Sequence, residues 1–247
     1  GTVFNEGSAD LDFRVESNDN ANAIFVNGAT NSVTIGASGT VSSIAGVNIL
    51  FEANSIFIGD DVSGTTDTAA NSVAFGIDAL DAVTTGDANV ALGKSTLSGN
   101  TTGGNNIAIG NQALNAPDTE SDNLAIGSNA LNGAVAGGEY NVAIGNSSLA
   151  ALTSADGNVA VGYQAGTALT TGNVTAIGHR AGDGLTTGGG GVHIGYDAGR
   201  VYDTENHNIG IGNYSLGSVI AGGEYNVAIG SFALDALTSG DNNTVLG

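Results

Sequence analysis

Short apolar segments with alternating side chains recur along this chain, and each one ends in glycine. The clearest of them are Asn106-Ile-Ala-Ile-Gly110, Asn141-Val-Ala-Ile-Gly145 and Asn158-Val-Ala-Val-Gly162. In each segment two large side chains flank a small alanine, which is the period of a β-strand. The pattern predicts very short strands whose Val and Ile side chains share one face while Ala occupies the other.

The segments return at a nearly constant interval. Successive closing glycines are 16 to 18 residues apart, most often 17. Identical short units stack as a ladder with about 4.8 Å per rung, so the period predicts an elongated parallel β-roll or β-helix solenoid of undetermined handedness. Each glycine is expected at a turn that other residues disfavour. These glycines are Gly59, Gly76, Gly93, Gly110, Gly127, Gly145, Gly162, Gly178, Gly195, Gly212 and Gly230.

The second half of each unit is less regular. A small residue and a leucine follow three and four residues after the glycine, as in Ala79-Leu80 and Ser148-Leu149, and another apolar residue often comes three later. A spacing of three breaks strand parity, so the segment is either a second short strand with a corner or one helical turn. We expect the second strand, followed by Thr-Thr-Gly-type turns.

Asparagine precedes the strand in most units. We predict a ladder of stacked amides, or asparagine in a left-handed turn; the alternative is an amide that binds sugar hydroxyls. The asparagines that stand four residues before their glycine include Asn106, Asn123, Asn141, Asn158 and Asn226.

Two regions are expected, an N-terminal β-rich adaptor over 1–53 and the repeat solenoid over 54–247. Each coil supplies only three or four modest apolar side chains, which makes a thin core. We therefore expect other chains to complete the apolar face.

Composition excludes several classes of function. Only 4 of 247 residues are Lys or Arg and the formal net charge is −20, so few phosphates can be neutralised and nucleic-acid binding is not expected. The chain has no cysteine, and hence no disulfide framework or Cys-ligated metal. No apolar run approaches the roughly 18 residues of a membrane span, so membrane insertion is not expected.

No constellation of catalytic residues stands out, and we predict neither enzymatic activity nor a cofactor. His179, His193 and His207 occupy different positions in their units, which disfavours a histidine metal site. Acidic pairs such as Asp60-Asp61 predict a solvated surface that keeps the rod soluble. Weak Ca²⁺ binding by stacked turn carboxylates and, less favoured, glycoside hydrolysis are the alternatives.

Aromatic residues gather in the second half of the chain. Tyr163 and Tyr196 follow a closing glycine directly, whereas Tyr214 and Phe232 come two residues after one. They are expected to form a stripe that packs between chains or contacts a receptor, since tyrosine both stacks on sugars and anchors protein interfaces.

The quoted residues resemble two families. The opening Val3-Phe-Asn-Glu, followed by Asp12-Phe-Arg-Val-Glu-Ser, is similar to a segment of bacteriophage tail fibres, and units such as 158–172 resemble fibre repeats that precede a C-terminal chaperone. Asn71-Ser-Val-Ala-Phe-Gly76 also resembles the head repeat of trimeric autotransporter adhesins, which is shorter, at about fourteen residues.

The resemblance implies an elongated tail fibre of a phage virion, built as an intertwined or side-by-side homotrimer, that attaches to the host. Its implied partners are other copies of itself, further tail or baseplate proteins, and a host surface glycan or protein. The alternative is a bacterial surface adhesin head, and a tailspike depolymerase is less favoured.

Overall fold

The computed structural model describes two kinds of segment. Backbone alone is described for the strands within 13–55, and residues 56–58 are described with their side chains. Residues 69–116, 119–133, 138–200, 204–217 and 222–247 are described in full. The statements below refer to these residues, and the acidic pair Asp60-Asp61 lies outside them.

The first strands form antiparallel pairs. Strands β1 (Phe13–Ser17), β2 (Asn20–Asn27) and β3 (Ser32–Thr34) make one sheet. Strand β4 (Thr40–Ile44) pairs with β5 (Val47–Glu52), and β5 pairs antiparallel with β6 (Ser55–Gly59). From β6 onward all pairing is parallel. Pairing changes from antiparallel to parallel at β6, the strand that follows the predicted boundary between residues 53 and 54.

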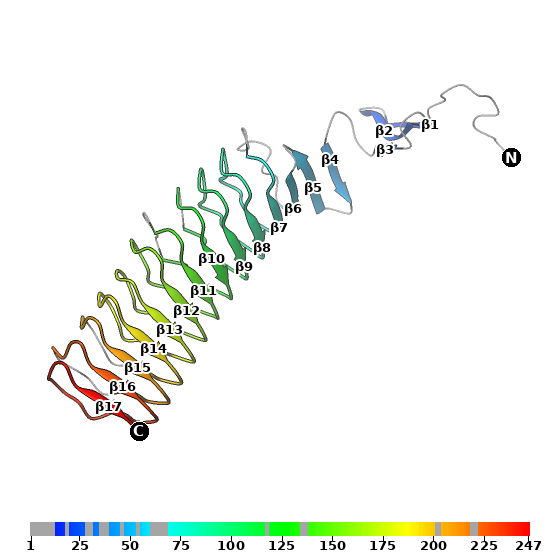
Figure 1. Ribbon diagram of the computed structural model, residues 1–247. Coiled ribbons are helices and arrows are strands. Elements are labelled where there is room, and N and C mark those ends of the chain that lie inside the picture. Colours follow the sequence, from blue (N-terminus) through cyan, green and yellow to red (C-terminus); the bar gives the residue numbers. More distant parts are fainter. Residues whose placement is uncertain are drawn as a thin grey trace.

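The repeat folds as the predicted parallel β-solenoid. One sheet runs in chain order from β6 to β17, each strand pairing in register with the next, so that Ala108, Ala125 and Ala143 are direct neighbours. Figure 1 shows the strands stacked as the rungs of a rod. Beyond β6 the strands are β7 (Val73–Gly76), β8 (Val90–Leu92), β9 (Ile107–Ile109), β10 (Leu124–Ile126), β11 (Val142–Ile144), β12 (Val159–Val161), β13 (Thr175–Ile177), β14 (Val192–Ile194), β15 (Ile209–Ile211), β16 (Val227–Ile229) and β17 (Thr244–Leu246).

The second residue of each strand from β7 to β17 points into the coil, and in β7–β13 it is alanine. Ala143 is fully buried in β11, whereas Val142 and Ile144 are only half-buried on the outside. The interior is filled by these alanines and by leucines from the segment after the strand, such as Leu114 and Leu149. The core therefore lies inside each single coil, and the larger strand side chains face outward.

The segment after the glycine differs from our expectation. It is not a second strand but a run of turns in which Gln112 and Leu114 have left-handed backbone, with φ of 55° and 46°. The N–H of Gln112 donates back to Lys94 of the preceding coil, and that of Leu114 donates forward to Ala130, both at 2.9 Å. This alternation bonds the segment to both neighbouring coils without strand geometry. Burial of Leu114 offsets the cost of about 1–2 kcal/mol of left-handed backbone.

The closing glycines are confirmed at turns. Their φ values in the described coils lie between 127° and 143°, a region essentially reserved for glycine. The described residues contain no helix with the length and apolarity needed to cross a bilayer.

Candidate functional site

The predicted asparagine ladder is present and is buried. The backbone N–H of Asn106 donates to Oδ1 of Asn89 at 3.0 Å, and its side-chain Nδ2 donates to the carbonyl of Glu120 at 2.8 Å. The same two kinds of bond are repeated at Asn123, Asn141 and Asn226. Because these amides are buried and hydrogen-bonded, they are not accessible to sugar hydroxyls. Their hydrogen bonds instead join and stabilise successive coils.

Asn158 completes the ladder with one variation. Its N–H and Nδ2 both donate to Oδ1 of Asn141 at 2.9 Å, and its own Oδ1 accepts from the N–H of Val174 at 2.8 Å. Asparagine in left-handed backbone, the other arrangement that the sequence favoured, occurs one residue earlier in the unit, at Asn71, Asn105 and Asn242.

Several turn carboxylates also bond neighbouring coils. Oδ1 of Asp87, Asp156 and Asp241 accepts from the backbone N–H of the residue seventeen positions earlier, at 2.7 to 2.9 Å. Glu205 accepts from the N–H of Gly222 at 2.9 Å. Within the described segments no group of three or more His, Asp and Glu side chains is arranged to hold a metal ion.

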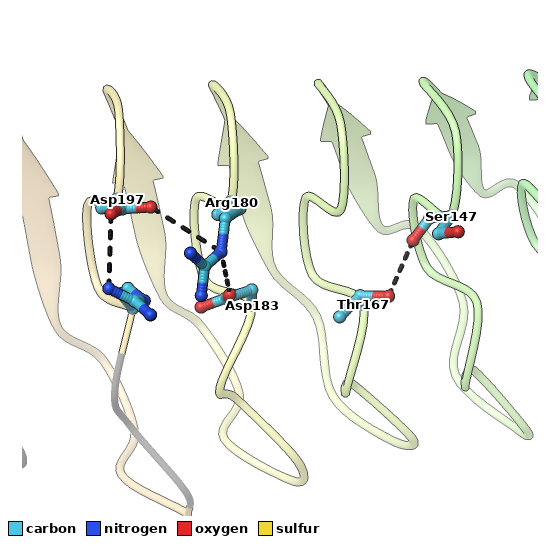
Figure 2. Close-up of polar contacts among 6 residues, drawn as sticks. Ser147, Thr167, Arg180, Asp183 and Asp197 are labelled. Atoms are coloured by element: carbon cyan, nitrogen blue, oxygen red, sulfur yellow. Dashed lines mark hydrogen bonds and ion pairs between the residues drawn. The ribbon is translucent and has the colours of Figure 1, made fainter.

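A cluster of charges that the sequence did not predict spans two coils. Nε of Arg180 lies 2.8 Å from Oδ2 of Asp183 and 3.9 Å from Oδ1 of Asp197, while Arg200 approaches Oδ2 of Asp197 at 3.5 Å. Figure 2 shows Arg180 between the two carboxylates, beside the bond from Thr167 to the carbonyl of Ser147. The hydrogen bond to Asp183 raises the pKa of Arg180, and burial raises the pKa of Asp183. Two of the four basic residues thus form ion pairs with aspartates of the same chain.

His193 lies in the core rather than at a ligand site. It takes the inward strand position that alanine holds in β7–β13, and it is 1% exposed. A side chain at Gly199 would overlap its ring, and Gly199 replaces the leucine that most other coils carry there. The imidazole fills the space of that leucine, and burial lowers its pKa from 6.5 to about 4.

The buried imidazole predicts acid sensitivity. Above pH 6.5 His193 is neutral in both the folded and the unfolded chain. Between pH 6.5 and about 4 it is protonated in the unfolded chain but stays neutral in the folded chain, which favours unfolding. The free energy of unfolding should therefore fall by about 3 kcal/mol between pH 6.5 and 4. Urea unfolding of the native chain and of His193→Ala across this range isolates the effect, because the variant keeps every other titrating group. Equal slopes in the two proteins would contradict it.

The predicted aromatic stripe is a ladder of stacked rings. Tyr163, His179 and Tyr196 follow one another with ring centroids 5.2 and 4.9 Å apart. The ladder continues through Tyr214 to Phe232 at 5.6 and 5.4 Å, with the Tyr196 and Tyr214 rings tilted by 57° and the Tyr214 and Phe232 rings stacked. Where the rings are stacked they cover one another's faces, which disfavours stacking of a sugar on them.

A second aromatic group lies on the other side of the strands. His207 stacks on Tyr225 at 5.0 Å, and Tyr140 occupies the same position of an earlier coil. We did not single out this group, although the 17-residue alignment places all three residues five before a closing glycine. Between the two aromatic sides lies the outward strand face, where Phe75 is 56% and Ile107 39% exposed.

Comparison of the chain with models of protein families, with curated proteins and with solved structures finds no match. The argument for function therefore rests on these surfaces.

Proposed function

We propose that this chain is a structural fibre protein of a phage virion, assembled as a homotrimer and used in host-cell attachment. The observation that carries the proposal is the outward strand face. Its outward positions in β7–β17 hold only Val, Ile, Leu, Phe or Thr, although 24 residues of the chain are acidic. A lone chain leaves this face in water.

The size of this face favours a protein partner. Eleven rungs at about 4.8 Å and three residues at about 3.3 Å give a stripe of roughly 50 by 10 Å. Such an area is at the upper end of the apolar patches that monomeric proteins expose. Other copies of the same chain supply an equally long and equally uncharged surface, with the same spacing of rungs.

The rest of the surface carries a strong negative charge, which repels nucleic-acid phosphates and favours solubility. Several turn carboxylates accept hydrogen bonds from the backbone, and we propose no catalytic role for them. As a fibre the chain would join other tail or baseplate proteins and contact a host surface glycan or protein. An antibody against the chain should label the tail of virions; labelling of a bacterial surface instead would favour the adhesin alternative.

Assembly is tested by the molar mass of the native protein in light scattering. We expect a mass near three chains of 24.1 kDa each. Ile144→Asp should shift the mass towards one chain, since Ile144 faces outward from β11 and a carboxylate there would be desolvated at the interface. Ser154→Asp adds the same charge at an exposed turn and should leave the mass unchanged. A native mass near one chain would refute the trimer, and a trimeric Ile144→Asp would refute this interface.

A further inference from the structure

The outward face has two borders, one before and one after the strand. The border positions are the residue five before each closing glycine and the residue directly after it, which flank the two outward strand residues in the sequence. In the six coils that close at Gly145 to Gly230, all of these border residues are exposed. The leading border consists of Tyr140, Gly157, Asn173, Gly190, His207 and Tyr225. The trailing border consists of Asn146, Tyr163, His179, Tyr196, Asn213 and Ser231.

The two borders of one chain are kept apart by the strand between them. The two positions are six apart in the sequence, and the three-residue strand between them spans about 10 Å. Among the described residues, ring contacts run along each border, as from Tyr163 to His179 and from His207 to Tyr225, and none joins the two borders. Contacts within one chain therefore do not explain any relation between the side chains of one border and those of the other.

The borders nevertheless match, coil by coil. Where the trailing residue carries a ring, the leading residue of that coil is small: Tyr163 is matched by Gly157, and Tyr196 by Gly190. Where the leading residue carries a ring, the trailing one is small, as with Tyr225 and Ser231. In the other three coils the residue paired with the ring is asparagine, and none of the six coils has a ring on both borders.

The aromatic ladder changes position in agreement with this rule. After Tyr196 it leaves the border and continues through Tyr214 and Phe232, one residue further on. The border positions in those two coils are Asn213 and Ser231. The step occurs where the leading border becomes aromatic, at His207 and Tyr225, so the two border positions of each of these coils still hold a single ring.

We propose that the leading border of one chain packs against the trailing border of a second copy at the same level, each ring filling the gap left by the small residue opposite. This inference rests on the proposed homotrimer and assigns its contacts. Joining two different borders is a heterologous contact, which closes when rotation brings the last chain back to the first. Parallel rods around an axis, with strand faces inward, place the borders in this relation.

Cysteine cross-linking tests the register, since the native chain has no cysteine. Tyr140→Cys combined with Asn146→Cys places one thiol on each border of the same coil. A short bis-maleimide, chosen because a ring-sized gap is too wide for a disulfide, should give covalent dimers and trimers. Either single variant, and the off-level pair Tyr140→Cys with Asn213→Cys, should remain monomeric in denaturing gels. Cross-linking of a single variant, or of the off-level pair alone, would overturn the proposal.

A ring added opposite a ring tests the complementarity. Gly157 has φ of 67°, close to the 59° of Tyr140 at the same position, and the nearest atom to a side chain there is 3.9 Å away. Gly157→Tyr thus fits its own chain but faces Tyr163 of the neighbour. It should weaken trimerisation at least about tenfold in sedimentation equilibrium, and the double variant Gly157→Tyr with Tyr163→Asn should recover most of the loss.

The outcomes separate this inference from the proposed function. A native mass near one chain would refute the trimer and the border contacts together. A trimeric mass with no same-level cross-link, or with Gly157→Tyr as stable a trimer as the native protein, would leave the fibre proposal standing and overturn the border contacts alone.

Discussion

Replacing Gly145 by valine is expected to break the solenoid at one coil. Gly145 has φ of 132°, and a Cβ on it would lie 2.5 Å from the carbonyl carbon of Gly162 and closer still to its oxygen. Those atoms are backbone of the next coil, so they cannot turn aside as a flexible side chain would. We expect a loss of about 4 kcal/mol or more in unfolding free energy, the range of the most damaging single substitutions.

The measurement is thermal unfolding at one fixed protein concentration, followed by circular dichroism, where a loss of this size lowers Tm by about 10 °C or more. Gly157→Asn is the matched control. Gly157 also has positive φ, at 67°, but a Cβ there comes no closer than 3.9 Å to another atom, and other coils carry asparagine at this position. If Gly145→Val were no more damaging than Gly157→Asn, the close approach of the next coil would not be what excludes a side chain at Gly145.

Asn141→Ala should have the next largest effect. Oδ1 of Asn141 accepts from the N–H and from Nδ2 of Asn158, both at 2.9 Å, and its Nδ2 donates to the carbonyl of Ala155 at 2.9 Å. Truncation leaves at least two buried polar groups without partners, each at a cost of about 1–3 kcal/mol. We expect a loss of about 3 kcal/mol.

Asn111→Ala provides the comparison for this prediction. Asn111 is exposed, so its truncation should change the free energy of unfolding by no more than about 0.5 kcal/mol. Urea unfolding of both variants measures the difference. If Asn141→Ala were as mild as Asn111→Ala, the asparagine ladder would be a consequence of stacking and not a cause of it.

The repeat made much of the fold predictable. Stacked coils place identical positions beside one another, so a feature that recurs every 17 residues is also a contact. This is why the alternation in Val142-Ala143-Ile144, the glycine that closes it and the asparagine before it predicted the strand, the turn and the ladder.

The candidate surfaces were predicted less completely. The ring ladder through Tyr163 and Tyr196 was visible as a stripe in the sequence. The ion pairs of Arg180 were not, because three-residue spacing within an irregular segment does not reveal which side chains face each other. His193 was considered as a metal ligand. It lies in the core instead, because Gly199 has no side chain and leaves space for the imidazole ring.

By itself the sequence determined the period, the strands, the parallel order of the coils and the separation of large from small side chains on two faces. Only the tertiary structure decided which face is inside. Alternation shows that Val142 and Ile144 lie on the opposite face from Ala143, but it does not show which of the two faces is buried. The turn segment decides this, because its left-handed residues bring leucines such as Leu149 back over the face that carries Ala143. The narrow coil then holds leucine with alanine, and the larger strand residues point outward.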